Sequence, residues 1–426
     1  MAARRGGAPA RRRLHRRRSR RGARPRARRG DPGDTRVSLI VKVAGRGDGV
    51  TANGRYAAFA APGDTLADDG SVLPGPHHQV PPCRHFPTCG GCQLQHLDDP
   101  SWAGFITERV GSALAAQGLV APIRAPLLSP PRTRRRATLH FEPSGRLGFS
   151  AEKSHQLVDL QECHVLAPEL FALVKPLKRL LASFRAKRRL DVHLALADQG
   201  PDVLVTGVAP EGLQHHDSIT AFAQAHGVAR VAFDDGLGAE TRWEPEPATV
   251  TLGDVAVPLP PGAFLQATHE GEAALVAAAR EAIGAPRTVA DLFAGLGTFA
   301  LALPARVYAA EGGRDALLAL KAGAGRAGRP VFTEHRDLYR RPLTATELDR
   351  FDAVVLDPPR AGAREQAAQL AASKVPVVAY ISCNPSSFAR DAKEMVEAGY
   401  RLDWVQPVGQ FRWSTHVELA ARLSRA

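Results

Sequence analysis

The chain has 426 residues, of which 44% are hydrophobic and 23% are charged. This composition predicts two or three globular domains and excludes a small scaffold held together by disulfides. No apolar run approaches the roughly 20 residues that cross a bilayer, and no apolar signal core follows the N-terminus, so we expect a cytoplasmic protein without a membrane partner.

The net charge of +13 arises in residues 1–30, which hold 14 arginines and no acidic residue, whereas the rest of the chain has 42 basic and 43 acidic residues. An arginine block repels itself and has no apolar face to bury, so residues 1–36 are predicted to be a disordered tail. Three interpretations of the tail stay open: an RNA-binding arm, a start codon assigned upstream of the true one near Val37, and an arginine-rich transit peptide.

Two short segments, 37–43 and 56–60, have the composition of strands and lie among glycine-rich turns. With the proline-rich linker that follows, they predict a fragment of a small β-barrel over residues 37–80. Residues 81–250 are expected to form a central α+β domain. Its expected helices and strands cover residues 103–118 and 167–187 (helices), and 190–196 and 202–208 (strands).

From residue 251 to the C-terminus, apolar strands alternate with helical segments. Such alternation predicts an α/β domain with a doubly wound, mainly parallel, Rossmann-like sheet. The expected strands cover residues 288–293, 306–310, 351–356, 375–382 and 417–423.

A nucleotide site is indicated where residues 289–298 run from a strand through a glycine turn, which we expect to lead into a helix. Glu311 ends the next strand, 20 residues after Asp291, where a carboxylate can bind ribose hydroxyls. This pattern alone fits a methyltransferase and a nicotinamide enzyme equally well.

Two turns at later strand ends favour methyl transfer, because ligands of doubly wound sheets bind at the carboxyl ends of the strands. Asp357 begins an Asp-Pro-Pro-Arg turn, and Cys383 lies in a Ser-Cys-Asn-Pro turn. Arg360 stands where an amino-group methyltransferase has an aromatic residue, which disfavours that chemistry. Carbon 5 of uracil becomes nucleophilic only after addition at carbon 6, and a thiolate is suited to that addition. The alternative for Cys383 is a buried small apolar residue.

Removal of the carbon 5 proton after methylation needs a base. Glu418 enters the final expected strand among apolar neighbours, where burial would raise its pKa toward a useful range. The alternative is an ordinary solvated acid at a strand end.

The other four cysteines are Cys83, Cys89, Cys92 and Cys163, and the first three are separated by five and two residues. Closely spaced thiols with glycines between them can surround one inorganic centre, and a cytoplasmic chain disfavours disulfides. Both zinc and an iron-sulfur cluster accept four thiolates.

Together these motifs resemble the RNA uracil-5 methyltransferase family over residues 81–426. The bacterial 23S rRNA branch is the most similar, because the related bacterial tRNA enzymes lack the four-cysteine cluster. The resemblance implies S-adenosylmethionine as methyl donor, Cys383 as nucleophile, Glu418 as base and a [4Fe-4S] cluster on the four cysteines. It also implies cofactor contacts by Gln266, Phe293, Thr298, Glu311, Asp337 and Asp357.

Three features depart from the family pattern. Residues 37–73 are short for the complete RNA-binding barrel called TRAM, Thr268 replaces a frequent asparagine, and residues 410–413 replace an Asp-x-Phe-Pro run. The last two departures leave Cys383 and Glu418 intact.

The sequence therefore predicts a monomeric enzyme that methylates carbon 5 of a uridine in 23S rRNA, acting on a loop or a flipped base. Alternatives are a tRNA uridine-5 methyltransferase and a non-catalytic RNA-binding or ribosome-assembly protein. A basic run is expected to bind RNA phosphates or to be a solvated strand end. Its members are Arg132, Arg134, Arg135 and Arg136.

Overall fold

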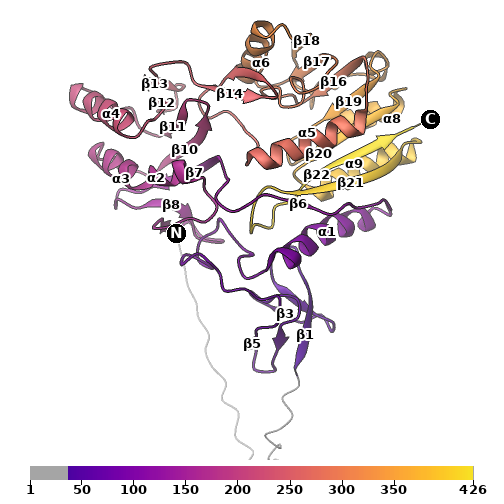
Figure 1. Cartoon of the computed structure of the whole chain (residues 1–426), viewed down its shortest axis with the longest axis horizontal. Helices are drawn as coiled ribbons and strands as arrows, with labels where there is room; N and C mark the ends of the chain where they lie inside the picture. The colour runs from indigo at the N-terminus through magenta and orange to yellow at the C-terminus, as the bar shows by residue number, and fades with distance from the viewer. Residues whose placement is uncertain (1–36, 426) are drawn as a thin grey trace, which may run out of the picture. The chain divides into compact units, whose positions relative to one another are not determined.

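The structure is a computed structural model that describes residues 37–425, and the predictions for residues 1–36 lie outside this part of the chain. Within the described residues the strands form four sheets (Figure 1). No helix of this part is long and apolar enough to cross a membrane.

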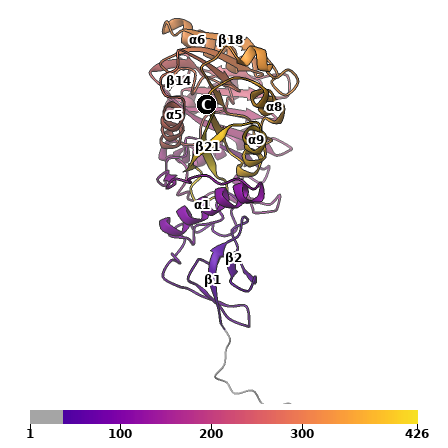
Figure 2. The same ribbon diagram turned by 90° about the vertical axis from the view of Figure 1, so that its right-hand side faces the viewer.

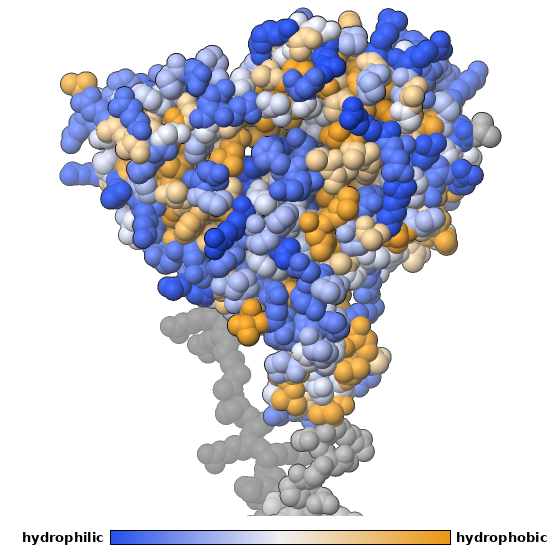
Figure 3. All heavy atoms as spheres, in the orientation of Figure 1, coloured by the Kyte–Doolittle hydropathy of each residue, from blue (hydrophilic) through white to orange (hydrophobic). Residues whose placement is uncertain are grey.

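The N-terminal sheet has five short strands in the order β3-β2-β1-β4-β5. Along β1, Ile40 is buried between the exposed Leu39 and Val41, as in a strand with one covered face, and the register shifts between Ile40 and Lys42, so that Val43 is buried as well. Apolar atoms gather on this sheet at the foot of Figure 3. The strands are β1 (Ser38–Val43), β2 (Gly49–Thr51), β3 (Tyr56–Ala57), β4 (Thr65–Leu66) and β5 (Val72–Leu73).

The middle sheet has seven strands in the order β13-β12-β11-β10-β7-β8-β9. Its strands are β7 (Arg136–Phe141), β8 (Leu147–Ser150), β9 (Leu157–Asp159), β10 (Leu190–Ala197), β11 (Gly200–Thr206), β12 (Arg230–Asp234) and β13 (Glu240–Trp243). Its helices are α2 (Pro168–Ala172), α3 (Val174–Ser183) and α4 (Leu213–Ala225).

The single helix expected over residues 167–187 is wrong, because α2 and α3 are separate helices that meet at Leu173. Pro176 lies in the first turn of α3 and has no amide hydrogen for a continuous helix, whereas a first turn tolerates that loss. The hydrophobic sides of both helices pack into the core beneath the middle sheet.

The C-terminal sheet has eight strands in the order β18-β17-β16-β19-β20-β22-β21-β6. The first five strands in this order, from β18 through β20, are parallel to one another. Strand β22 is antiparallel to β20, and β21 is antiparallel to β22. The strands are β16 (Thr288–Leu292), β17 (Arg306–Glu311), β18 (Val331–His335), β19 (Ala353–Leu356), β20 (Val377–Ser382), β21 (Arg401–Gly409), β22 (Glu418–Ser424) and β6 (Leu127–Leu128). A separate hairpin, β14 (Thr249–Leu252) and β15 (Val255–Pro258), precedes them.

Helices cover both faces of the C-terminal sheet, so successive strand residues enter different cores. Val354 packs into the core that holds α8 and α9, while Val355 packs into the core that holds α5. Figure 2 shows α5 on one side of the sheet and α8 with α9 on the other. The helices are α5 (His269–Ile283), α6 (Arg314–Arg326), α7 (Ala345–Leu348), α8 (Arg364–Ala372) and α9 (Pro385–Glu397).

The helix α1 (Asp99–Ala116) packs against α9 and β21 of this C-terminal layer. Its Glu108 also pairs with Lys42 of β1, and Figure 2 shows α1 between the N-terminal strands and α9. Strand β6 likewise extends the C-terminal sheet through Val408 and Leu127. Residues 99–128 therefore pack with the C-terminal sheet, although they fall within the expected central domain.

Candidate active site

Cys383 and Glu418 come from neighbouring antiparallel strands of the C-terminal sheet. Ser382, the last residue of β20, is paired with Leu419 of β22, so Cys383 and Glu418 are the next residues at the same edge. Both line one cavity of about 790 Å³. The fold thus brings the two expected catalytic residues to one site.

The turn that carries Cys383 is tied to the Asp-Pro-Pro-Arg turn. The Asn384 side chain accepts a hydrogen bond from the Ser386 amide (3.1 Å) at the start of α9 and donates one to the Arg360 carbonyl (3.0 Å). Ser387 Oγ donates to the same carbonyl at 3.1 Å. An asparagine cap and the proline that follows it favour this helix start. Cys383 is therefore held against the turn that follows β19.

Burial raises the pKa of the Cys383 thiol to about 11, with further raising by Glu418 and Asp357 and a partial offset from Arg360. Burial also raises the pKa of Glu418 to about 8, assisted by Asp357 and opposed by a hydrogen bond from Gln410. Perturbed groups of this kind cluster at functional sites. Glu418 is suited to accept a proton near neutral pH, and the thiol needs to lose its proton before it can attack.

Four of the six expected cofactor residues lie along the same edge of the sheet, while Gln266 and Thr298 lie in the loops before α5 and after β16. Because β18, β17, β16, β19 and β20 are parallel neighbours, the residues at their carboxyl ends follow one another. In sheet order these residues are Asp337, Glu311, Phe293, Asp357 and Cys383, with Glu418 beyond them.

The turn after β16 is shaped by glycines and by a buried carboxylate. Gly295 and Gly297 have φ of 54° and 95°, a region that favours glycine. Asp291 Oδ2 accepts from the Ala300 amide at 2.8 Å, and Glu311 Oε2 accepts from the Gly295 amide at 2.9 Å. The α-helix expected directly after this turn is wrong, because residues 295–302 form successive turns that contain the half-buried Thr298.

A buried carboxyl group with one unpartnered oxygen lies beneath this turn. Oδ1 of Asp291 is buried and has no hydrogen-bond partner within residues 37–425. Burial, together with Asp357 and Glu311, raises the pKa of Asp291 to about 8. Burial and Glu311 raise that of Asp357 to about 7. A cationic ligand beside these carboxylates would offset their mutual repulsion.

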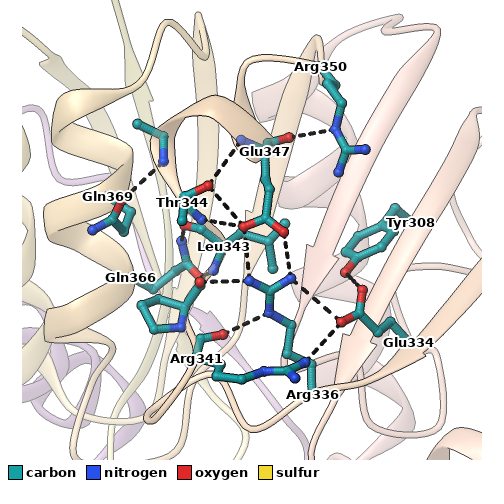
Figure 4. Close-up of polar contacts among 12 residues, drawn as sticks. Tyr308, Glu334, Arg336, Arg341, Leu343, Thr344, Glu347, Arg350, Gln366 and Gln369 are labelled. Carbon is teal, nitrogen blue, oxygen red and sulfur yellow. Dashed lines mark hydrogen bonds and ion pairs between the residues drawn. The ribbon is translucent and has the colours of Figure 1, made fainter.

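Arg336 fixes the loop on which Asp337 lies (Figure 4). Its guanidinium donates to Glu347 Oε1 and Oε2 (2.8 and 2.9 Å) and to the carbonyl of Arg341 (2.8 Å). Asp337 in turn accepts from the Tyr339 amide at 3.0 Å. This bidentate pair gives the adenine side of the expected cofactor site a defined shape.

The expected phosphate-binding run is divided by the structure. Arg135 is fully buried and donates to the Gln266 carbonyl (3.0 Å) and to Glu272, so its assignment to RNA phosphates is wrong. Arg134 and Arg136 instead line the cavity with Cys383. Arg134 forms an isolated bridge and Arg136 begins β7, and successive side chains of extended backbone point to opposite sides, which explains the division.

Aromatic rings and cations share the cavity wall. The Arg136 guanidinium lies 4.2 Å from the centre of the Phe264 ring, and that of Arg134 lies 5.6 Å from the centre of Phe411. Further basic side chains on the wall are Arg46, Lys153 and Arg360. Bases can stack on rings while cations contact phosphates, so this wall is chemically suited to RNA.

All four remaining cysteines line a second, small pocket and are free thiols. Arg134 lines this pocket as well as the larger cavity. Among the residues that the structure describes, however, no three histidine, cysteine, aspartate or glutamate side chains are grouped closely enough to hold a metal ion. The shared pocket and the four thiols suit a metal centre chemically, and the [4Fe-4S] cluster stays a prediction.

Comparisons with known proteins identify the family. Residues 331–426 match the family described as tRNA (Uracil-5-)-methyltransferase. An RNA methyltransferase of Zymomonas mobilis is 50% identical and covers 91% of this chain and 100% of its own. The 23S rRNA (uracil(1939)-C(5))-methyltransferase RlmD of Halomonas elongata is 36% identical over 80% of this chain and 75% of its own. This chain belongs to the RNA uracil-5-methyltransferase family.

Membership excludes the nicotinamide-enzyme alternative and makes the protein an S-adenosylmethionine-dependent RNA methyltransferase. The tRNA (uracil-54, C5)-methyltransferase of Pyrococcus abyssi, solved with S-adenosyl-L-homocysteine, has a TM-score of 0.72 and covers 91% of this chain and 99% of its own, at 23% identity. That likeness confirms the mixed α/β methyltransferase fold.

Proposed function

We propose that this methyltransferase acts on carbon 5 of a uridine in 23S rRNA through a covalent adduct with Cys383, with Glu418 as the base. The observation that carries the proposal is the pairing of Ser382 with Leu419, because Cys383 and Glu418 adjoin this pair and both line one cavity. The 23S rRNA assignment is supported by the similarity to the Halomonas enzyme.

In the proposed cycle, the Cys383 thiolate forms a C–S bond to carbon 6 of the uracil, and the electrons of the C5=C6 bond move into an enolate at O4. Bound S-adenosylmethionine supplies the methyl group that carbon 5 takes up, and the electron pair of the broken S–CH₃ bond stays on sulfur. Glu418 then accepts the carbon 5 proton, the C5=C6 bond forms again, and the C–S bond breaks to release the Cys383 thiolate.

We propose that the cofactor is held along the sheet edge by six residues, four at or beside strand ends and two in the loops before α5 and after β16. Glu311 already accepts two backbone amides of the turns around it, which orients its carboxylate. The six are Gln266, Phe293, Thr298, Glu311, Asp337 and Asp357.

We also propose that Cys83, Cys89, Cys92 and Cys163 hold a [4Fe-4S] cluster. A four-thiolate centre would join the loop 83–92 to Cys163 and stiffen one wall of the substrate cavity, because Gly90 and Gly91 belong to that wall.

The deciding experiment maps 5-methyluridine in rRNA and tRNA from a strain that lacks the gene. We expect one 5-methyluridine to disappear from 23S rRNA and to return with the wild-type gene, but not with a gene encoding Cys383→Ala. Loss from tRNA instead would support tRNA methylation, the second candidate, which the name of the matching family favours. No change in either RNA would contradict both.

A further inference from the structure

The side chain of Gln410 connects two parts of the expected active site. It directly follows β21 and is 1% exposed. Its Oε1 accepts a hydrogen bond from the Ala267 amide at 2.9 Å, and its Nε2 donates to Gln266 Oε1 at 2.8 Å. The Gln410 side chain also lies near the Glu418 carboxylate, whose pKa it lowers.

The direction of these bonds follows from their chemistry. A backbone amide can only donate, so Gln410 must present its oxygen to Ala267 and its NH₂ group to Gln266. Gln266 must therefore turn its own oxygen toward Gln410. Its amide nitrogen has no hydrogen-bond acceptor among residues 37–425, and it is left as a donor for a ligand.

The same NH₂ group has two hydrogens, so one remains for Glu418 after the bond to Gln266. Buried amides keep their orientation when all of their hydrogen-bonding groups are used, because an unpaired buried group costs about 1–3 kcal/mol. The Gln410 carboxamide thus couples the orientation of the Gln266 side chain to the position of the Glu418 carboxylate.

The surroundings leave room for Gln410 and for little else. A Cβ atom at Gly271 of α5 would lie 2.5 Å from the Gln410 Cβ and 2.8 Å from its Oε1. The start of α5 is held in turn by Thr268, whose Oγ1 accepts from the Gly271 amide at 2.9 Å. Gln410 also lies in the run where this sequence departs from the family pattern.

We propose that Gln410 is a positioning residue for the methyl-transfer reaction, which fixes Gln266 as a hydrogen-bond donor to an acceptor oxygen of a bound ligand and holds Glu418 in place to take the carbon 5 proton. The inference rests on the proposed function. The acceptor oxygen belongs either to the cofactor or to the uracil, and separate measurements of cofactor and RNA binding distinguish these two sources.

Two substitutions separate the roles of the carboxamide. Gln410→Glu is nearly isosteric and keeps an acceptor for Ala267, but it cannot donate and it adds negative charge beside Glu418. We expect the midpoint of the pH dependence of turnover to rise by about one unit or more, and the methylated protein-RNA adduct to accumulate. Gln410→Met removes every hydrogen bond, and we expect kcat to fall roughly tenfold or more.

Gln406 provides the matched control, because it is a buried carboxamide four residues earlier whose Nε2 donates to the Ala125 carbonyl at 2.8 Å. Gln406→Met should keep the wild-type pH midpoint and adduct level even if it lowers stability. Calorimetric binding of S-adenosylhomocysteine and the KM for RNA show which ligand the Gln266 donor serves, since only that ligand should bind more weakly to the Gln410 variants.

A wild-type pH midpoint and adduct level in Gln410→Glu would overturn the inference. If the variants do not fold, a crystal structure of the wild-type enzyme with S-adenosylhomocysteine and RNA decides, because Gln266 must then direct its nitrogen, and not its oxygen, at a ligand oxygen. A wild-type enzyme that makes no 5-methyluridine would instead contradict the proposed function itself.

Discussion

Cys383 and Glu418 are held next to each other by the register of two antiparallel strands, in which Ser382 pairs with Leu419. The hydrogen bonds of a β-ladder fix this register, so the pair does not depend on a flexible loop. Burial raises the pKa of the thiol to about 11, with a further contribution from Glu418, and burial together with Asp357 raises the pKa of the Glu418 carboxyl group to about 8.

The rate of methylation should increase with pH. The thiol must lose its proton to attack, and Glu418 must be ionised to accept the carbon 5 proton, so both requirements are met better at higher pH. We expect kcat/KM to rise by up to roughly a hundredfold per pH unit below about pH 8, where both groups are protonated, and by roughly tenfold per unit above it, where only the thiol is. Single-turnover assays from pH 6 to pH 9 measure this slope, and a rate that falls over that range would contradict the assignments.

The stability of Glu418→Gln should depend on pH in a defined direction. The raised pKa of Glu418 in the folded state favours the protonated form, so its contribution to stability is complete below about pH 4.5 and is lost as the pH rises through about 8. Glutamine stays neutral at every pH. The variant should match the wild type at pH 5 and melt at a temperature higher by roughly 3 °C or more at pH 9. Scanning calorimetry at both values tests the sign, and a smaller difference at pH 9 than at pH 5 would contradict it.

Arg135 should stabilise the fold and not the RNA complex. Its buried guanidinium binds Glu272 and the Gln266 carbonyl, and Arg135→Met would leave the Glu272 carboxylate without its partner. We expect a loss of roughly 3–5 kcal/mol in the free energy of unfolding. The exposed pair Arg146–Glu142 is the control, where Arg146→Ala should cost under about 1 kcal/mol. If urea unfolding gave equal losses of unfolding free energy for Arg135→Met and Arg146→Ala, burial of the Arg135–Glu272 pair would not contribute to stability.

The positions of Cys383 and Glu418 at strand ends could be predicted, because apolar strands and the turns that follow them can be recognised from a few neighbouring residues. Five strands of the C-terminal sheet, from β16 to β22, were predicted within a few residues, and Cys383 and Glu418 lie at the ends of two of them. Strand β18 has a partly polar sequence, and β6 is two residues long and pairs with Val408 far along the chain, so neither gives a local pattern. Edge strands of this kind depend on tertiary contacts.

The roles of single polar residues were harder to predict, because their partners are distant in sequence. Arg135 was grouped with its basic neighbours, yet its partners Gln266 and Glu272 lie more than 120 residues away. Gln410 was visible only as a departure from a family pattern, whereas its contacts with Gln266 and Ala267 require the folded chain. Sequence reasoning selected Cys383 and Glu418 as candidate nucleophile and base, whereas the contacts of Gln410 and Arg135 came from the structure.

The protein purified without oxygen should be brown and contain about four irons with acid-labile sulfide. The four cysteines line one pocket, in which Glu162 is the single carboxylate among the lining residues that the structure describes. Thiolates select zinc or iron-sulfur centres. Iron and sulfide analysis with an absorption spectrum measures this content. One zinc without sulfide would contradict the cluster, whereas misfolding of Cys89→Ser would fit either metal.

The two catalytic roles should fail at different steps when each residue is replaced. Cys383→Ala has no thiol to add at carbon 6, so neither methyl transfer nor a covalent RNA complex should form. Glu418→Gln should still add the thiol and transfer the methyl group, but the carbon 5 proton stays in place and elimination stops. This variant should accumulate a denaturant-resistant protein-RNA adduct that carries label from the methyl donor, visible on a denaturing gel. Turnover of Glu418→Gln at the wild-type rate would show that Glu418 is not the base, and 5-methyluridine formed by Cys383→Ala would exclude the covalent mechanism.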